Sequence, residues 1–158
     1  MRWALAVVVL LVACGGPASG GRTPGLPDGV RTAPEAVTAE ARLYTLRADL
    51  VRDVMPGPAP TPRRGVSGTI FLRADVPSDV PPGMRAGRAW LLAGSDVWET
   101  TPEPLQTLTV DRRFHLSLGV RDGPVWEVGS NVDVVLEFFA AGRAYLVRQR
   151  AVQVVGAL

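Results

Sequence analysis

The chain has 158 residues, which is enough for one ordinary domain. Hydrophobic residues make up 47% of it and charged residues 20%, so the composition is that of a folded protein and excludes wholesale disorder. A single Cys and a single His exclude a disulfide framework and a classical zinc site. The 17 basic residues, all Arg, nearly balance 15 acidic ones, and they form no stripe with aromatic residues. Nucleic-acid binding is therefore not expected.

The N-terminus has the pattern of an export signal. Met1 and Arg2 are followed by an apolar run, Trp3 to Val12, which is too short to cross a bilayer and has the length of a signal-peptide core. The run ends in Leu11-Val12-Ala13-Cys14, which resembles the lipobox of bacterial lipoproteins. The resemblance implies cleavage before Cys14, a diacylglycerol on its thiol and a further acyl chain, such as palmitate, on its amine. The alternative is an ordinary signal peptide with a chance Cys.

The residue after Cys14 is Gly15 and not Asp. By the same resemblance this favours a lipoprotein of the bacterial cell envelope that is held in the outer membrane and faces the periplasm. We expect a signal peptide over residues 1–13, a lipidated Cys and flexible Gly/Pro-rich tether over 14–36, and a β domain over 37–158.

Short alternating segments with frequent turn residues follow the tether. Around Ala39 to Tyr44 the alternation predicts a strand, although a helix over Glu35 to Arg47 is a competing prediction. Pro-rich loops are expected at Met55–Pro62 and Val76–Gly83, and a tight turn at Ala141-Gly142. The other predicted strands are Ser67–Ala74, Arg88–Ala93, Gln106–Val110, Arg113–Gly119, Val132–Ala140, Arg143–Gln149 and Ala151–Val155. This pattern predicts an all-β domain, an antiparallel β-sandwich of immunoglobulin-like or transthyretin-like topology.

Residues able to support catalysis are few. His115 alternates to the outward face of its predicted strand, and lipid would consume the thiol of Cys14. Asp133 and Glu137 lie four residues apart on a strand, hence about 13 Å, which exceeds the spacing of paired carboxylates in glycosidases. We expect them to face Arg143 or Arg148 across the hairpin. The sequence thus predicts a protein that is not an enzyme and implies no cofactor and no metal, with a weak carboxylate hydrolase as a minor alternative.

Three motifs stand out in the domain. They are Asp49-Leu-Val-Arg-Asp-Val-Met-Pro56, Arg121-Asp-Gly-Pro-Val-Trp126 and Val132-Asp-Val-Val135. Together with Ala93-Gly-Ser-Asp-Val-Trp98 and Tyr145-Leu-Val-Arg148, they resemble a family of small bacterial secreted or lipid-anchored β proteins with an Arg-Asp-Gly-Pro-x-Trp motif. The chain departs from that pattern at Val54, where an aromatic residue is expected, and at Glu127-Val128, where Gly-Pro is expected. The resemblance implies a fold and no activity.

Three aromatic residues are candidate contacts for a ligand or partner. Trp98 and Trp126 lie at predicted loop edges and Tyr145 in a predicted strand, where they either pack as end caps or bind a partner. The leading hypothesis is a membrane-anchored module for protein interaction or envelope assembly. A glycan-binding module that uses these rings is the alternative. The uncharged C-terminal segment from Ala151 is predicted to pair with another chain if it is an edge strand.

Overall fold

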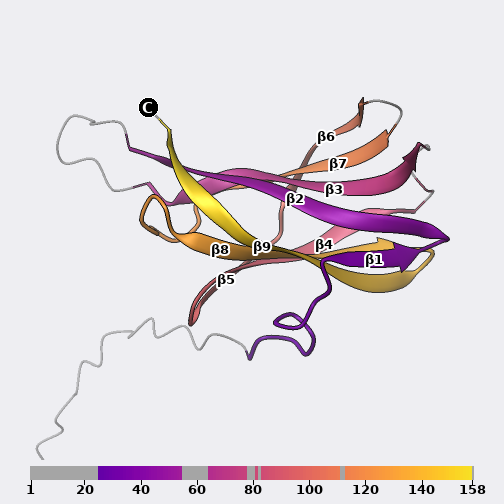
Figure 1. Ribbon diagram of the computed structural model, residues 1–158, viewed down its shortest axis with the longest axis horizontal. Helices are drawn as coiled ribbons and strands as arrows, with labels where there is room; N and C mark the ends of the chain where they lie inside the picture. Colours follow the sequence, from indigo (N-terminus) through magenta and orange to yellow (C-terminus); the bar gives the residue numbers. More distant parts are fainter. Residues whose placement is uncertain (1–24, 55–63, 78–80, 82, 111–112, 158) are drawn as a thin grey trace, which may run out of the picture.

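The computed structural model describes residues 25–54, 64–77, 81, 83–110 and 113–157 (Figure 1). All regular secondary structure in these residues is β-strand, so the predicted all-β class is confirmed. The strands are β1 (Ala36–Ala39), β2 (Arg42–Asp53), β3 (Val66–Pro77), β4 (Arg85–Ala93), β5 (Asp96–Thr100), β6 (Glu103–Val110), β7 (Arg113–Val120), β8 (Asn131–Ala140) and β9 (Arg143–Ala157). Within the described ranges no helix is long and apolar enough to cross a membrane.

The strands form one curled, mixed sheet. Their order is β5-β4-β8-β9-β2-β3-β7-β6, with β1 added beside β2. All neighbouring pairs are antiparallel except β2 and β9, which run parallel from Leu50 opposite Val154 to Asp53 opposite Ala157. The expectation of a purely antiparallel sheet is therefore wrong. The reason is the length of β9, whose first part pairs with β8 and whose last part continues to β2.

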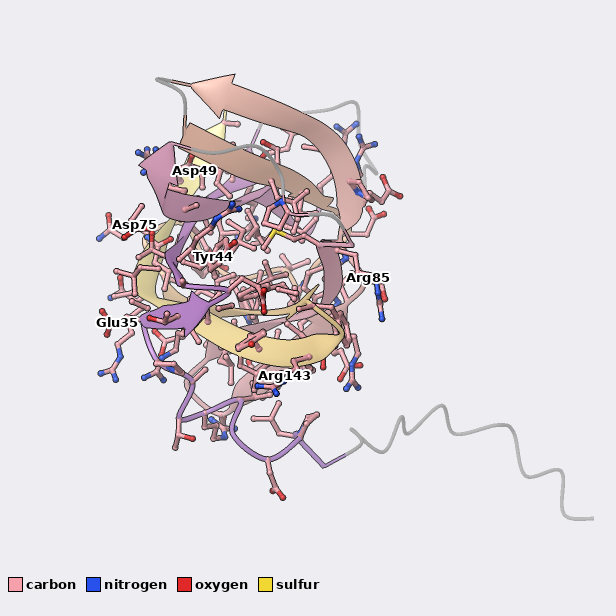
Figure 2. The ribbon with its side chains drawn as sticks, turned by 90° about the vertical axis from the view of Figure 1, so that its right-hand side faces the viewer. Glu35, Tyr44, Asp49, Asp75, Arg85 and Arg143 are labelled. Carbon is pink, nitrogen blue, oxygen red and sulfur yellow. The ribbon has the colours of Figure 1, made fainter. Side chains whose placement is uncertain are left out.

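The core lies between the two halves of this sheet. One half contains β5, β4, β8 and the first part of β9, and the other contains β2, β3, β7 and β6, as Figure 1 shows. On β2 every second side chain from Tyr44 to Arg52 is buried, which follows from the period of two along a strand. Figure 2 looks into the molecule from one end and shows Tyr44 pointing to the interior. The largest buried core side chains are Tyr44, Leu50, Ile70, Leu72, Leu91, Leu118, Leu136 and Phe138.

Two hairpin turns have both central residues in the left-handed region. The predicted turn at Ala141 and Gly142 is confirmed, with φ values of 46° and 76°. A second turn at Glu40 and Ala41, with φ values of 49° and 57°, divides the strand that was predicted across them into β1 and β2. The strand prediction for this region is confirmed over the helix, but the turn was not foreseen because neither residue favours positive φ.

Residues 26–34, which we call the strap, pack on the outer face of β4 and β8. Val30 and Ala33 are buried there against Trp90, Leu92 and Val135. The strap is held by β9, since the Arg148 N–H donates to Pro34 O at 2.8 Å and its Nη1 donates to Arg31 O at 2.7 Å. The C-terminal part of the predicted tether thus belongs to the folded domain.

The C-terminal segment is an interior strand and not an edge. Val152 pairs with β8, Val154 and Val155 pair with β2, and the side chains of Val152 and Val154 are buried. The condition on which this segment was predicted to pair with another chain, that it is an edge strand, is therefore not met. The predictions for Cys14, for the loop Met55–Pro62 and for the side chain of His115 lie outside the described residues and side chains.

Candidate functional site at the loop end

The three predicted aromatic contacts lie at two different ends of the sheet. Trp126 precedes β8, is 9% exposed and belongs to the core. Trp98, on β5, is half-buried against the same core, and a Cβ at Gly123 would lie 3.4 Å from its ring. Tyr145 is half-buried near the other end of β8, where its ring stacks on that of Phe138 with the centroids 5.4 Å apart. The structure brings Trp98 and Trp126 together and leaves Tyr145 apart from them.

We call the end of the sheet that holds Trp126 the loop end. There the first two sequence motifs meet through a buried arginine. Arg52 is 9% exposed, and its Nη1 donates to the carbonyl oxygen of Trp126 at 2.9 Å. The same atom lies 3.3 Å from a carboxylate oxygen of Glu127. A guanidinium in this position replaces its lost hydration by charge-assisted hydrogen bonds. Arg52 therefore fixes the loop after β7 to the end of β2.

The loop 121–126, hereafter the DGP loop, continues the pairing of β7 with the start of β3. The Gly123 N–H donates to Val66 O at 2.9 Å and the Val66 N–H donates to Pro124 O at 3.0 Å. The two backbones approach so closely that a Cβ at Gly65 would lie 1.7 Å from Gly123 O. Asp122 adopts a positive φ of 58°, a conformation that Asp tolerates in turns. These bonds give the DGP loop a defined position.

The third motif stabilises a bulge in β9 at Arg150 and Ala151, shortly before β9 passes from β8 to β2. Ala151 has a φ of 51°, and its N–H donates to Oδ1 of Asp133 at 2.9 Å. Oδ2 of Asp133 lies 3.7 Å from Arg148 Nη1, as the sequence predicted. Glu137 instead lies 3.8 Å from Arg88 Nε on the neighbouring β4. The two carboxylates of β8 thus serve separate ion pairs.

No family model, curated protein or solved structure matches this chain.

Four exposed valines lie where β2 and β9 end. We call them the valine cluster: Val51, Val54, Val128 and Val155, which are 38%, 40%, 48% and 56% exposed. Val51 and Val155 are register partners in the parallel pair. A Cβ at Gly156 would lie 3.5 Å from Val54 Cγ2 and 3.6 Å from Val128 Cγ2. Because Gly156 and Val155 point to opposite faces of β9, Val54 and Val128 lie on the other face from Val51 and Val155, and the cluster covers both faces of this end. The sequence alone does not reveal this cluster, because it depends on the pairing of β2 with β9.

Ionic residues border the valine cluster in pairs. Arg64 Nη1 lies 2.7 Å from Asp53 Oδ2 beside the end of β2, and Glu127 is bound to Arg52. Among the side chains that the structure describes, no three of His, Cys, Asp or Glu are grouped to hold a metal ion. The chemistry offered by this end is an apolar contact area with a rim of paired charges.

Two grooves lie on either side of the DGP loop. One, of about 550 Å³, is lined by Arg64, Gly65, Ser67, Arg121, Asp122, Gly123 and Val125. The other, of about 510 Å³, is lined by Gly25, Leu26, Arg31, Ser95, Asp96, Val97, Pro124 and Trp126. Of the three aromatic candidates, Trp126 lines the second of these grooves, beside the charged residues Arg31 and Asp96.

Proposed function

We propose that this protein is a non-enzymatic lipoprotein that binds a protein partner of the cell envelope through the valine cluster. Cys14 would carry the lipid and hold the protein to the outer membrane on its periplasmic side. The curled sheet would act as a sandwich-like scaffold whose loop end is the binding surface. The observation that carries the proposal is the presence of four valines, 38–56% exposed, at one end of the domain, with Val51 and Val155 on one face of the β2–β9 pair and Val54 and Val128 on the other.

An exposed apolar cluster has a free-energy cost in water that binding removes. Burial of apolar surface contributes about 25 cal/mol per Å², and apolar patches with a polar rim are typical of interaction sites. Here the rim consists of the pairs Arg64–Asp53 and Arg52–Glu127. Asp53 and Glu127 are used in these pairs, which supports a binding surface over acid–base chemistry.

The distance between anchor and domain also suits an envelope partner. Ten residues, Gly15 to Pro24, separate Cys14 from the first described residue, Gly25. A fully extended chain of that length spans at most about 36 Å. The proposed surface would therefore stay within reach of partners at the same membrane.

The test is a crosslinking pull-down of the tagged full-length protein from native membranes. Val128→Arg and Val155→Arg should each abolish capture of one specific protein, because a buried charge opposes apolar contact. Leu43→Arg is the matched control, since Leu43 is 38% exposed on the β1–β2 hairpin, and it should leave capture unchanged. Cys14→Ala should release the protein from the membrane. Capture that is indifferent to both cluster variants would refute the proposed surface.

Glycan binding is the second candidate, and the groove at Trp126 favours it. Arg31, Ser95 and Asp96 line that groove beside the indole and could hydrogen-bond sugar hydroxyls. Envelope polysaccharides should then change the tryptophan fluorescence of the protein, and Asp96→Ala should remove the change. An unchanged spectrum at saturating polysaccharide would leave the protein-binding proposal alone.

A further inference from the structure

The two ends of the curled sheet differ in how well they are protected against pairing with another strand. An edge strand exposes unpaired N–H and C=O groups, and proteins protect such edges by shortness, charge, Pro or bulges. The last strand at one end is β5, which has five residues and carries Asp96 and Glu99. It is short and acidic, and it presents a poor template for a further strand.

The strand at the other end, β6, is protected only at its beginning. Glu103, Pro104 and a shift in register between Pro104 and Gln106 all lie in its first residues. From Gln106 to Val110 the strand pairs regularly with β7 and contains no charge, no Pro and no Gly. Of the described strands only β7 is paired with it, so β6 is an edge strand of the described sheet.

We propose that β6 pairs antiparallel with β6 of a second copy of this chain and joins two domains in a symmetric dimer. The absence of charge from Gln106 to Val110 means that no like charges oppose one another when the strand pairs with itself. Thr107, Thr109 and Val110 are β-branched, a residue class that favours cross-strand pairs. Because this segment of β6 has no charge, it also has no electrostatic means of selecting a different strand over its own copy.

The inequality of the two edges also sets the size of the assembly. A two-fold axis through paired β6 strands uses the same surface of both copies and closes the assembly at two. Growth beyond a dimer would need the second edge, which in this sheet is the short, acidic β5. A dimer and not a fibre is therefore expected.

The proposal is tested by disulfide crosslinking of the full-length protein in membranes. Gln106, Thr107, Leu108 and Thr109 are replaced by Cys one at a time, because opposite residues near a two-fold axis lie within disulfide distance of their own copies. Oxidation should give a species of twice the protomer mass, strongest at one of the four positions. Asp96→Cys, on the β5 edge, is the matched control and should not crosslink.

The disruptive variant places a charge in the pairing strand. Thr107→Lys should leave the circular dichroism spectrum unchanged and reduce crosslinking from the best of the other three positions at least tenfold. The measurement is repeated with Cys14→Ala, and crosslinking should persist, because pairing through β6 does not depend on the lipid anchor. A result of no crosslink at any of the four positions, an equal yield at Asp96→Cys, or an adduct with a different protein would each overturn the dimer.

Discussion

At the loop end, some backbone segments approach so closely that only glycine fits between them. The clearest case is Gly65, where a Cβ would lie 1.7 Å from the carbonyl oxygen of Gly123. Gly65→Ala should therefore lower the free energy of unfolding by about 3 kcal/mol, the upper range for overpacking. Chemical denaturation measures the change. Gly25→Ala is the control, because nothing lies within 4 Å of its Cβ, and it should stay within about 0.5 kcal/mol of the wild type.

Tyr44 should make the fold sensitive to alkaline pH. Burial of its ring raises the pKa of the phenol above the ordinary value of 10.0, although Arg42 opposes the shift. Above pH 10 the unfolded chain releases this proton while the folded protein retains it, so the free energy of unfolding decreases as the pH rises. The stabilisation is complete below the unfolded pKa and is lost above it. Denaturation curves from pH 8 to 11 should show the decrease, and Tyr44→Phe should reduce its slope.

Among the elements, the strap gives the sharpest prediction. Val30 of the strap is fully buried against β4 and β8, so Val30→Ala removes two methyl groups from an apolar contact at about 0.8 kcal/mol each. We expect the amide of Arg148, which donates to Pro34 O, to exchange its hydrogen faster in this variant. The exposed Asp28→Ala should leave that exchange unchanged. If Arg148 keeps its wild-type protection in Val30→Ala, the strap does not depend on this contact.

The elements also show what a sequence can and cannot predict. Alternation is a local property, so the strands around Ser67–Ala74 and Val132–Ala140 were predicted close to their observed bounds. The strap was not predicted, because its few apolar residues are scattered among Gly and Pro. The pairing of β2 with β9 joins residues about a hundred positions apart, and local patterns carry no information on such pairings.

The same distinction applies to the candidate site. Arg52, Asp133 and Trp126 could be singled out in the sequence because they lie in recognisable motifs. What they do could not be predicted, since Arg52 acts on the carbonyl of Trp126 and Asp133 on the amide of Ala151. The valine cluster is even harder to predict from the sequence. Val51 and Val155 become neighbours only through the parallel register.

At the scale of the whole molecule, β9 joins the two halves of the sheet. It pairs with β8 in one half and with β2 in the other, and no other strand pair in the described order connects them. Deletion of residues 151–158 should therefore abolish the cooperative thermal unfolding of the domain, measured by circular dichroism. A shortened protein that still unfolds cooperatively would show that the halves hold together by core packing alone.

A pair of adjacent substitutions separates the structural role of β9 from its proposed role in binding. Val154 is 1% exposed in the core, whereas Val155, its neighbour, is 56% exposed in the valine cluster. Val154→Asp would bury a charge without a partner and should unfold the domain, since such a change costs several kcal/mol against a total stability of about 5–15 kcal/mol. Val155→Asp should leave the melting temperature within a few degrees and abolish capture of the envelope partner. Because the two residues point to opposite faces of one strand, equal effects of the two changes on folding would contradict the observed register of β9 on β2.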